Sequence, residues 1–271
     1  MSILTKTYYF FSLLFTITIL SGCSDIIEYS PYQAGVKIPA KELNIAAIDS
    51  IQKISKQEFA PFTIGLISDS HTWYDQFEEQ IDYLNQHENI DFAVHLGDLT
   101  LSGIYREFVW FHEVSSKLTH PLITVIGNHD YLSNGEVMYQ EMFGPLNFTL
   151  VYNNCLFVFM DDVIWEKNVE DPDFKWLESV LKGSEKYQYR FVLSHIPPWS
   201  DDFSIGNQYY FEMLLNKYKV DLSIHGHNHG YEYREKGEGK TNHLIVPSSK
   251  SEEVLFLHIQ EKDYTIQRDF L

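Results

Sequence analysis

The sequence contains few cysteines and few basic residues for its length. Its 271 residues include 2 cysteines, Cys23 and Cys155, so a cysteine-type structural zinc site is excluded. Lysine and arginine total 20 against 38 aspartate and glutamate residues, and the formal net charge is -18. A chain with this charge has no general electrostatic attraction for nucleic acid or for an anionic membrane surface. We therefore expect no nucleic-acid-binding surface.

The N-terminal segment lacks an apolar run long enough for a bilayer-spanning helix. The run from about Tyr8 to Leu20 is shorter than the roughly 20 residues that such a helix needs. Lys6 precedes this run, and the letters "LSGC", which end at Cys23, close it. This order resembles the signal peptide and lipobox of bacterial lipoproteins, in which the cysteine is lipidated. A plain N-terminal membrane helix or a chance match is the alternative.

The lipoprotein resemblance implies a location and a division of the chain. Residues 1–22 would be a signal peptide, residues 23–60 a tether with an N-terminal extension, and residues 61–271 the domain that carries the chemistry. Lipid on Cys23 would anchor this domain to a membrane of the bacterial cell envelope, outside the cytoplasm. Cys155 would then be a single buried thiol.

The body of the chain alternates strand-like and helix-like segments. Hydrophobic residues make up 44% of the chain, which is enough for a sizeable core. Apolar β-branched runs predict strands, apolar residues at helical spacing predict helices, and their alternation indicates an α/β fold. Strands are predicted at residues 62–68, 91–97, 121–127, 154–161, 189–195, 220–226, 243–249, 253–259 and 264–270. Helices are predicted within residues 41–59, at 74–86, 105–118 and 174–182, and near 136–143 and 210–217.

Aspartate, asparagine and histidine side chains follow the ends of these predicted strands. In open α/β sheets, ligands gather just beyond the carboxyl ends of the strands. The residues concerned are Asp69, His71, Asp98, Asn128, His129, Asp130, His195, His227 and His229. This pattern predicts a shared polar site at one end of the fold.

The chemistry of these side chains predicts two divalent metal ions. Carboxylate, imidazole and amide oxygen ligands together suit Mn, Fe(II), Zn or Ni. In an extended segment, Asp69 and His71 would point to the same side and reach one ion. Seven of these nine side chains, taken as ligands, exceed the number that one such ion takes. Two ions are therefore expected, about 3.5–4 Å apart. Asp98 is the candidate for the carboxylate that bridges them.

The same residues form five motifs in a fixed order, and this order resembles the calcineurin-like metallophosphoesterase superfamily. The motifs are Asp69-Ser70-His71, Gly97-Asp98, Gly127-Asn128-His129-Asp130, His195 and Gly226-His227-Asn228-His229. The resemblance implies two mixed β-sheets packed face to face and flanked by helices. It also implies that the protein is a metal-dependent phosphoesterase.

The resemblance assigns a role to each motif residue. One metal ion would be held by Asp69, His71, Asp98 and His229. The other would be held by Asp98, Asn128, His195 and His227. A hydroxide that bridges the ions would attack the phosphorus in line, with His129 near the leaving-group oxygen as general acid or transition-state stabiliser.

One departure from the family pattern concerns His129. Many relatives carry an acid three positions after the bridging aspartate, where it partners this histidine, but here that position is Leu101. The sequence therefore leaves open what orients His129. Two further histidines, His95 and His225, are expected to pack in the core or behind the ligands.

Substrate preference rests on the short loop after Asp98. This loop is most similar to the small bacterial phosphodiesterase branch, so we expect a phosphodiesterase that acts on a small-molecule or lipid-linked phosphoester. A phosphomonoesterase of the same fold is the first alternative. A non-catalytic, metal-bound binding lipoprotein is the second.

Overall fold

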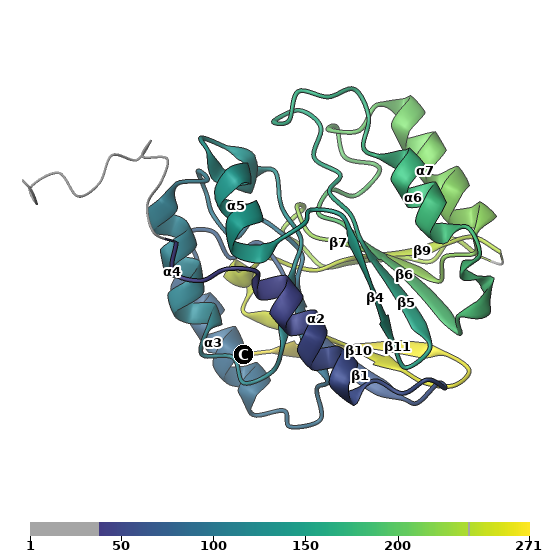
Figure 1. Cartoon of the computed structure of the whole chain (residues 1–271), viewed down its shortest axis with the longest axis horizontal. Coiled ribbons are helices and arrows are strands. Elements are labelled where there is room, and N and C mark those ends of the chain that lie inside the picture. Colours follow the sequence, from purple (N-terminus) through teal and green to yellow (C-terminus); the bar gives the residue numbers. More distant parts are fainter. Residues whose placement is uncertain (1–37, 238) are drawn as a thin grey trace, which may run out of the picture. The chain divides into compact units, whose positions relative to one another are not determined.

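The computed structural model describes residues 38–237 and 239–271 (Figure 1). Two β-sheets face each other in this part of the chain, with helices on their outer sides. The predicted signal peptide, the lipidation site Cys23 and the first part of the predicted tether lie outside the described residues. No helix within the described ranges is both long and apolar enough to cross a bilayer.

The first sheet has five strands in the order β11-β10-β1-β2-β3. Its central strands β1 (Phe62–Ile67), β2 (Phe92–His95) and β3 (Leu122–Thr124) are parallel. Strand β10 (Glu253–Ile259) runs antiparallel to β1, and β11 (Tyr264–Phe270) pairs antiparallel with β10. The parallel strands place the segments that follow β1, β2 and β3 at one edge of the sheet.

The second sheet has six strands in the order β4-β5-β6-β7-β9-β8. Its four inner strands are parallel, and the outer strands β4 and β8 pair antiparallel with their neighbours. Both sheets are therefore mixed, which confirms the predicted sandwich. The strands are β4 (Phe148–Tyr152), β5 (Cys155–Phe159), β6 (Tyr189–Leu193), β7 (Leu222–His225), β8 (Glu232–Arg234) and β9 (Asn242–Ile245).

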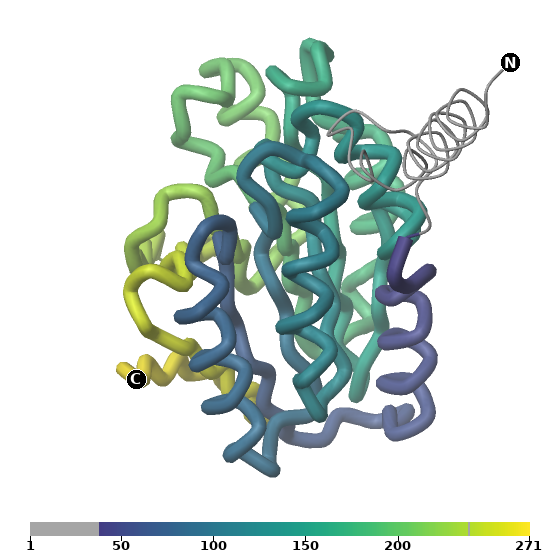
Figure 2. The backbone as a smooth tube through the Cα atoms, turned by 90° about the vertical axis from the view of Figure 1, so that its left-hand side faces the viewer, coloured from purple at the N-terminus to yellow at the C-terminus, as the bar shows by residue number. Residues whose placement is uncertain are grey.

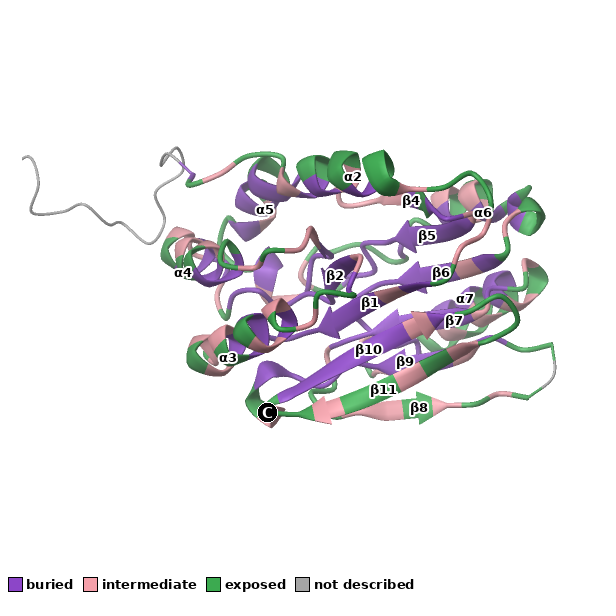
Figure 3. Cartoon of the chain, turned by 90° about the horizontal axis from the view of Figure 1, so that it is seen from below, coloured by how far each residue is buried: buried purple, intermediate pink, exposed green. Residues whose placement is uncertain are grey.

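Alternation along the strands divides the core into an inner and an outer part. Cys155, Phe157 and Phe159 of β5 face the core between the sheets. Leu156 and Val158 face the outer core, which includes α6 (Phe174–Leu181) and α7 (Ile205–Lys217). Because both faces of these strands are buried, they read as continuous apolar runs in the sequence. Figure 3 shows the same burial for the inner strands, whereas the edge strands β8 and β11, like the helices and loops, carry exposed and intermediate residues.

Aromatic rings join the two sheets across the inner core. The ring of Phe157 on β5 lies edge-on to Phe92 of β2, with centroids 5.7 Å apart, and to Phe62 of β1 at 6.1 Å. Tyr152 on β4 also packs edge-on against Phe62 at 5.0 Å. Such T-shaped pairs add about 0.5–1.5 kcal/mol each beyond the burial of their area. The sheets are thus held in a defined orientation to each other.

Helices α3 and α4 lie side by side on the first sheet, while α6 and α7 lie on the outer side of the second (Figures 1 and 2). Helix α5 adjoins α4. The predicted helices are all present, with α7 beginning five residues earlier than the position near 210. Their bounds are α3 (Tyr74–Asn85), α4 (Tyr105–Ser115), α5 (Gly135–Phe143), α6 (Phe174–Leu181) and α7 (Ile205–Lys217).

Helix α2 (Leu43–Ile54) is the helix expected within residues 41–59. Its buried residues Ala47 and Ile51 lie four positions apart, on one face, and pack into the core between the sheets. The Asn44 side chain exchanges two 2.9 Å hydrogen bonds with the backbone of Thr124 at the end of β3. This helix therefore packs on the domain, while the predicted division of the chain at residue 60 stays a prediction.

Candidate metal centre

The segments after β1 and β2 run alongside each other and carry the first two motifs. The backbone N–H of Asp69 donates to the carbonyl of Gly97 at 3.1 Å, and the N–H of His71 donates to the carbonyl of Asp98 at 3.2 Å. Asp69 has a φ of 48°, so the expected extended segment is wrong at this point. A left-handed turn, held by these two hydrogen bonds, brings both side chains into the site.

Four of the seven predicted metal ligands have left-handed backbone conformations. Their φ angles are 48° for Asp69, 54° for Asp98, 69° for His227 and 60° for His229. Such conformations cost about 1–3 kcal/mol each for residues other than glycine, and they persist where the surrounding structure holds them. Their concentration at one place is typical of a functional site.

Two motif glycines leave room for the carboxylates. A Cβ atom on Gly127 would lie 2.1 Å from Oδ1 of Asp98, and one on Gly226 would lie 2.7 Å from Oδ2 of Asp69. No larger residue fits in either position without moving a ligand. The glycines of the third and fifth motifs therefore permit the close approach of the loops.

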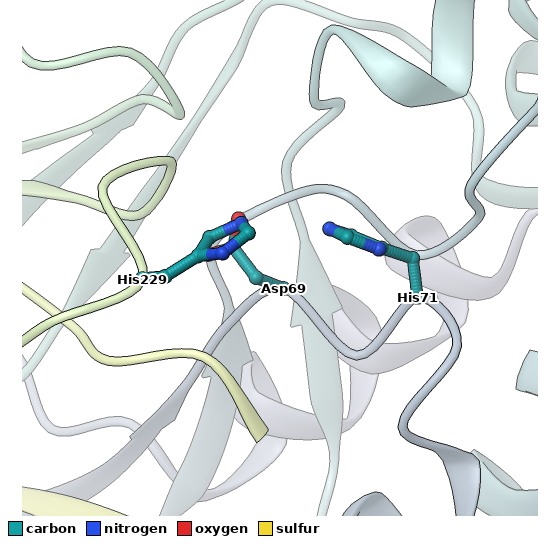
Figure 4. Close-up of side chains that lie close together, drawn as sticks. All are labelled: Asp69, His71 and His229. Carbon is teal, nitrogen blue, oxygen red and sulfur yellow. The ribbon is translucent and has the colours of Figure 1, made fainter. Parts of the chain in front are cut away.

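Asp69, His71 and His229 converge from two loops (Figure 4). One potential ligand atom from each lies within 4.8 Å of the other two. Nε2 of His229 is 3.4 Å from Oδ1 of Asp69. The other carboxylate oxygen of Asp69 accepts a hydrogen bond from the N–H of His227 at 3.1 Å, which ties the first motif to the fifth.

Asp98 occupies the middle of the cluster. Its Oδ2 lies 3.8 Å from Nε2 of His71 and 3.3 Å from Nε2 of His195. Its Oδ1 accepts a 3.0 Å hydrogen bond from the N–H of His129. One oxygen of a single buried carboxylate thus lies close to imidazoles from two different motifs, as a bridging ligand must.

His195, His227 and Asn128 extend the cluster beyond Asp98. The rings of His195 and His227 are nearly perpendicular, with centroids 5.3 Å apart, and Nδ1 of His227 lies 3.2 Å from Oδ1 of Asn128. Nδ1 of His195 donates to the carbonyl of Leu96 at 2.6 Å, which leaves Nε2 to face Asp98. All seven predicted ligands therefore lie in one contiguous cluster.

The cluster contains buried polar atoms that lack hydrogen-bond partners. They include Oδ1 of Asp69, both ring nitrogens of His71 and Nε2 of His195. Buried polar side-chain atoms in native proteins are nearly always hydrogen-bonded, so such atoms indicate a missing partner. Unpaired carboxylate oxygens and imidazole nitrogens that face each other fit divalent cations, and the residues present therefore fit a two-metal centre.

The pKa values of the cluster reflect the pairing of its carboxylates with its imidazoles. Burial acts to raise the pKa of Asp98, but neighbouring His195 outweighs it, and the pKa of the carboxyl group is lowered. Burial acts to lower the pKa of His195, but Asp98 outweighs it and raises this pKa to about 10, and a hydrogen bond to a carboxylate raises the pKa of His229. Burial lowers the pKa of His71 and of His227. Because metal ions bind ionised carboxylates and neutral imidazoles, a metal ion would compete with protons at His195 and His229.

His129 lies beside the cluster, at the start of a short 3-10 turn (His129–Tyr131). Its ring stacks on that of His71, with centroids 5.0 Å apart and 21° between the planes. Nδ1 of His129 donates to the backbone carbonyl of Leu101 at 2.7 Å. A carbonyl group thus orients this histidine in place of the acid that relatives carry, and sequence reasoning missed it because every residue has a carbonyl.

Two buried aspartates hold the loops that carry the motifs. Asp130 accepts hydrogen bonds from the backbone N–H groups of Leu99, Thr100 and Gly127, and burial raises its pKa to about 7. It therefore shapes the loops and lies behind the ligands. Asp162 accepts from the N–H of His195 at 3.3 Å. Its place three residues beyond the end of β5 was the signal that could have identified it.

His95 and His225 do not join the cluster, as expected from the sequence. Nε2 of His95 bonds to Oγ of Ser70 at 3.0 Å, and burial lowers the pKa of His95 to about 3. The two ring nitrogens of His225 bond to Oγ of Ser223 at 2.9 Å and to Oγ of Ser194 at 3.1 Å. Both rings are therefore buried, neutral supports behind the site.

Comparisons with known proteins identify the family of this chain. Residues 62–231 match the family model described as calcineurin-like phosphoesterase. The Fe(3+)-Zn(2+) purple acid phosphatase 12 of Arabidopsis thaliana is 26% identical over 207 residues, which are 65% of this chain and 44% of that protein. The chain thus spans less than half the length of this relative.

Solved structures share the fold. A dimetal phosphatase from Danio rerio has a TM-score of 0.64 and 14% identity, over 77% of this chain and 96% of that one. The purple acid phosphatase PPD1 of yellow lupin (Lupinus luteus) has a TM-score of 0.63 and 16% identity, over 79% of this chain and 52% of that one. GAP50, the anchor in the inner membrane complex of Plasmodium, has a TM-score of 0.61 and 13% identity, over 77% and 84%.

Proposed function

This chain belongs to the calcineurin-like phosphoesterase family, and we propose that it is a hydrolase that cleaves phosphoester bonds with two divalent metal ions. The observation that carries the proposal is the position of Asp98. One of its oxygens lies 3.8 Å from Nε2 of His71 and 3.3 Å from Nε2 of His195. A carboxylate in this place can belong to two ions at once, and the two-ion arrangement is the one that phosphoester hydrolysis uses.

The ligand sets follow from the cluster. Asp69, His71 and His229 would hold one ion together with Asp98, because their ligand atoms already lie within 4.8 Å of one another. Asn128, His195 and His227 would complete the second set around Asp98. When bound, two divalent cations lower the pKa of a coordinated water molecule and offset the negative charge of the phosphate.

The proposed role of His129 is at the leaving group. The bond to the Leu101 carbonyl keeps a proton on Nδ1, so Nε2 is the atom that can hold a proton and give it to the departing oxygen. The ring is partly exposed, and its partner in stacking, His71, belongs to the cluster. His129 can therefore touch a substrate bound at the cluster without being enclosed by the protein.

The charge around the cluster supports a phosphodiester, rather than a phosphomonoester, as the substrate. Within residues 38–237 and 239–271, no lysine or arginine forms an ion pair with a side chain of the cluster (ion pairs there join only His and Asp). A phosphodiester carries one negative charge, whereas a monoester carries up to two and needs more compensation. We infer a phosphodiesterase that acts on a small-molecule or lipid-linked ester.

A phosphomonoesterase is the alternative that the comparison with purple acid phosphatase 12 favours, since that relative is a phosphatase. The phosphodiesterase and phosphomonoesterase assignments are distinguished by assaying a bis-aryl and a mono-aryl phosphate, each with added Mn²⁺ and with a chelator. We expect turnover of the diester only, lost with the chelator and in the His129→Ala variant. Preferred cleavage of the mono-aryl phosphate would show that the monoesterase assignment is correct instead.

The fold also occurs in GAP50, which is described as an anchor. A non-catalytic binding protein is therefore a second alternative. It predicts that elemental analysis finds two ions per chain while neither aryl phosphate is hydrolysed at any metal concentration. Turnover of either ester by protein that has regained Mn²⁺ after chelation excludes it.

For location, we propose a lipid anchor on Cys23 at the bacterial cell envelope. The proposal rests on the "LSGC" sequence alone, because Cys23 lies outside the described residues. Expression in a bacterium with an alkyne-tagged fatty acid tests it. The full-length protein should become labelled and sediment with membranes, and the Cys23→Ser variant should do neither; equal labelling of both would refute the anchor.

A further inference from the structure

Two acidic residues outside the predicted ligand set contact the second half of the cluster. Oδ2 of Asp202, in the segment between β6 and α7, lies 2.9 Å from Nε2 of His227. Oε1 of Glu166, in the segment between β5 and α6, accepts a 3.1 Å hydrogen bond from the side-chain Nδ2 of Asn128. Each acid therefore contacts a different predicted ligand from behind.

Asp202 determines which nitrogen of His227 carries the proton. An ionised carboxylate only accepts hydrogen bonds, so a 2.9 Å contact with Nε2 requires the proton on Nε2. A neutral imidazole carries one N–H proton, and Nδ1 then presents a lone pair. Nδ1 lies 3.2 Å from Oδ1 of Asn128, a contact that is a hydrogen bond when Nδ1 carries the proton and a pair of facing lone pairs when Nε2 carries it.

Glu166 determines the orientation of the Asn128 amide in the same manner. Its carboxylate accepts from the amide NH₂ group, so the amide oxygen must face the other way, toward Nδ1 of His227. With the proton of His227 on Nε2, two lone pairs, one on nitrogen and one on oxygen, face each other across this contact. A cation between two such atoms satisfies both of them.

We propose that Asp202 and Glu166 are positioning residues that selectively strengthen the metal site formed by Asn128 and His227. This proposal deepens the proposed function and rests on it, because it concerns one of the two ions of the same centre. The acids act through the ligands, by setting a tautomer and an amide orientation.

In the described part of the chain, no acidic residue outside the predicted ligands contacts His71 or His229, although Asp69 accepts hydrogen bonds from Oγ of Ser68 and from the N–H of His227. Both ring nitrogens of His71 lack a hydrogen-bond partner there, and the ion pair of His229 is with Asp69, itself a predicted ligand. Outer partners of metal ligands change metal affinity by about 10–100-fold. The two sites should therefore differ in affinity, with the Asn128–His227 site the tighter one.

The burial of the two acids makes the effect local. The side chain of Asp202 is 13% exposed and that of His227 is 20% exposed. Oε2 of Glu166 is buried and has no hydrogen-bond partner among the described residues. Partly buried charges are screened less by salt than exposed ones, so the carboxylates also add negative potential at this site in particular.

Titration of the metal-free full-length protein with Mn²⁺, followed by calorimetry, tests the proposal. The wild type should show two binding events. Asp202→Asn and Glu166→Gln should each weaken the tighter event by about tenfold or more and leave the weaker one unchanged. The matched controls are Asp201→Asn and Glu170→Gln, exposed neighbours with the same charge change, which should leave both events unchanged.

A second measurement locates the proton on the His227 ring. In metal-free protein, the ¹⁵N chemical shifts of His227 should show the proton on Nε2 in the wild type and a shift toward the Nδ1 form in Asp202→Asn. Equal weakening of both Mn²⁺ events, or unchanged affinity in both variants, would overturn the proposal. A lower Tm of the metal-free Asp202→Asn protein than of Asp201→Asn would indicate a merely structural role and would also overturn it.

The proposed function can be refuted independently of the roles proposed for Asp202 and Glu166. If the wild type binds two Mn²⁺ ions but hydrolyses no phosphoester, the hydrolase assignment is wrong, and the calorimetric comparison of the variants still decides the roles of Asp202 and Glu166.

Discussion

The backbone carbonyl of Leu101 lies 2.7 Å from Nδ1 of His129 and accepts its hydrogen bond. The position where relatives carry an acid is thus occupied by a residue that acts through its main chain. A neutral carbonyl orients the ring as an acid does, but it places no full negative charge beside it. His129 is therefore positioned for proton transfer without the electrostatic help of a partner carboxylate.

The first prediction separates the main chain of Leu101 from its side chain. Leu101→Ala keeps the carbonyl and changes a side chain that is 39% exposed, so we expect kcat to stay within about twofold of the wild type. His129→Ala should lower kcat by about 10²–10⁴-fold while two metal ions remain bound. A large loss of kcat in Leu101→Ala would show that the side chain, rather than the carbonyl, supports His129.

The second prediction concerns Gly127. Alanine there would place a Cβ atom 2.1 Å from Oδ1 and 2.2 Å from the backbone nitrogen of Asp98, so the loops must separate. Gly127→Ala should lower the free energy of unfolding by about 1–3 kcal/mol or more and reduce metal content. Gly206→Ala in α7 is the control, because the nearest atom to its Cβ would be 3.7 Å away. Denaturant unfolding and elemental analysis measure both, and an unchanged metal content in Gly127→Ala would contradict the geometry.

The third prediction concerns metal removal. The folded cluster is the only conformation that gathers its ligands, so bound ions add to the free energy of unfolding, by about 2.7 kcal/mol for a site at 100 times its Kd. Each kcal/mol raises the Tm by about 2–4 °C in chains near this size. A chelator should therefore lower the Tm by about 5–10 °C for each site that was occupied at 100 times its Kd, and excess Mn²⁺ should restore it. A Tm that is indifferent to the chelator would argue against bound ions.

The fourth prediction is a pH dependence away from the cluster. Glu212 of α7 lies 3.2 Å from Nε2 of buried His243 and 3.3 Å from Nζ of Lys236. Burial acts to raise the pKa of Glu212, but His243 and Lys236 outweigh it, so the folded-state pKa lies below the usual value. Ionised Glu212 therefore stabilises the fold above its unfolded-state pKa, and this contribution is lost as the pH falls through the folded-state pKa.

Comparison with Glu212→Gln measures this effect. The wild type should be more stable than the variant at neutral pH, and the difference should disappear on acidification below the ordinary range for glutamate. Glu235→Gln changes an exposed acid immediately after β8 and serves as the control, for which we expect no such pH-dependent difference. A difference that is constant with pH would show that Glu212 acts through packing alone.

The sequence predicted those strands and helices whose burial is reflected in the type and order of their side chains. Strands β5 and β6 were predictable because both faces are buried and the residues form continuous apolar runs. Strands β4 and β8 were missed because they lie at the edges of the second sheet, where partly exposed residues break that pattern. The early start of α7 was missed because its signal is a single capping residue, Ser204, whose Oγ accepts from the N–H of Asn207.

The sequence alone determined which side chains are available at the strand ends, and their order identified the family and the two-metal hypothesis. Only the tertiary structure decided how these side chains are oriented. The left-handed turn at Asp69, the carbonyl that holds His129, and the acids Asp202 and Glu166 depend on contacts between loops far apart in the chain. The physical reason is that hydrogen-bond partners and backbone conformations are properties of the packed loops, and they leave no pattern in the amino-acid sequence.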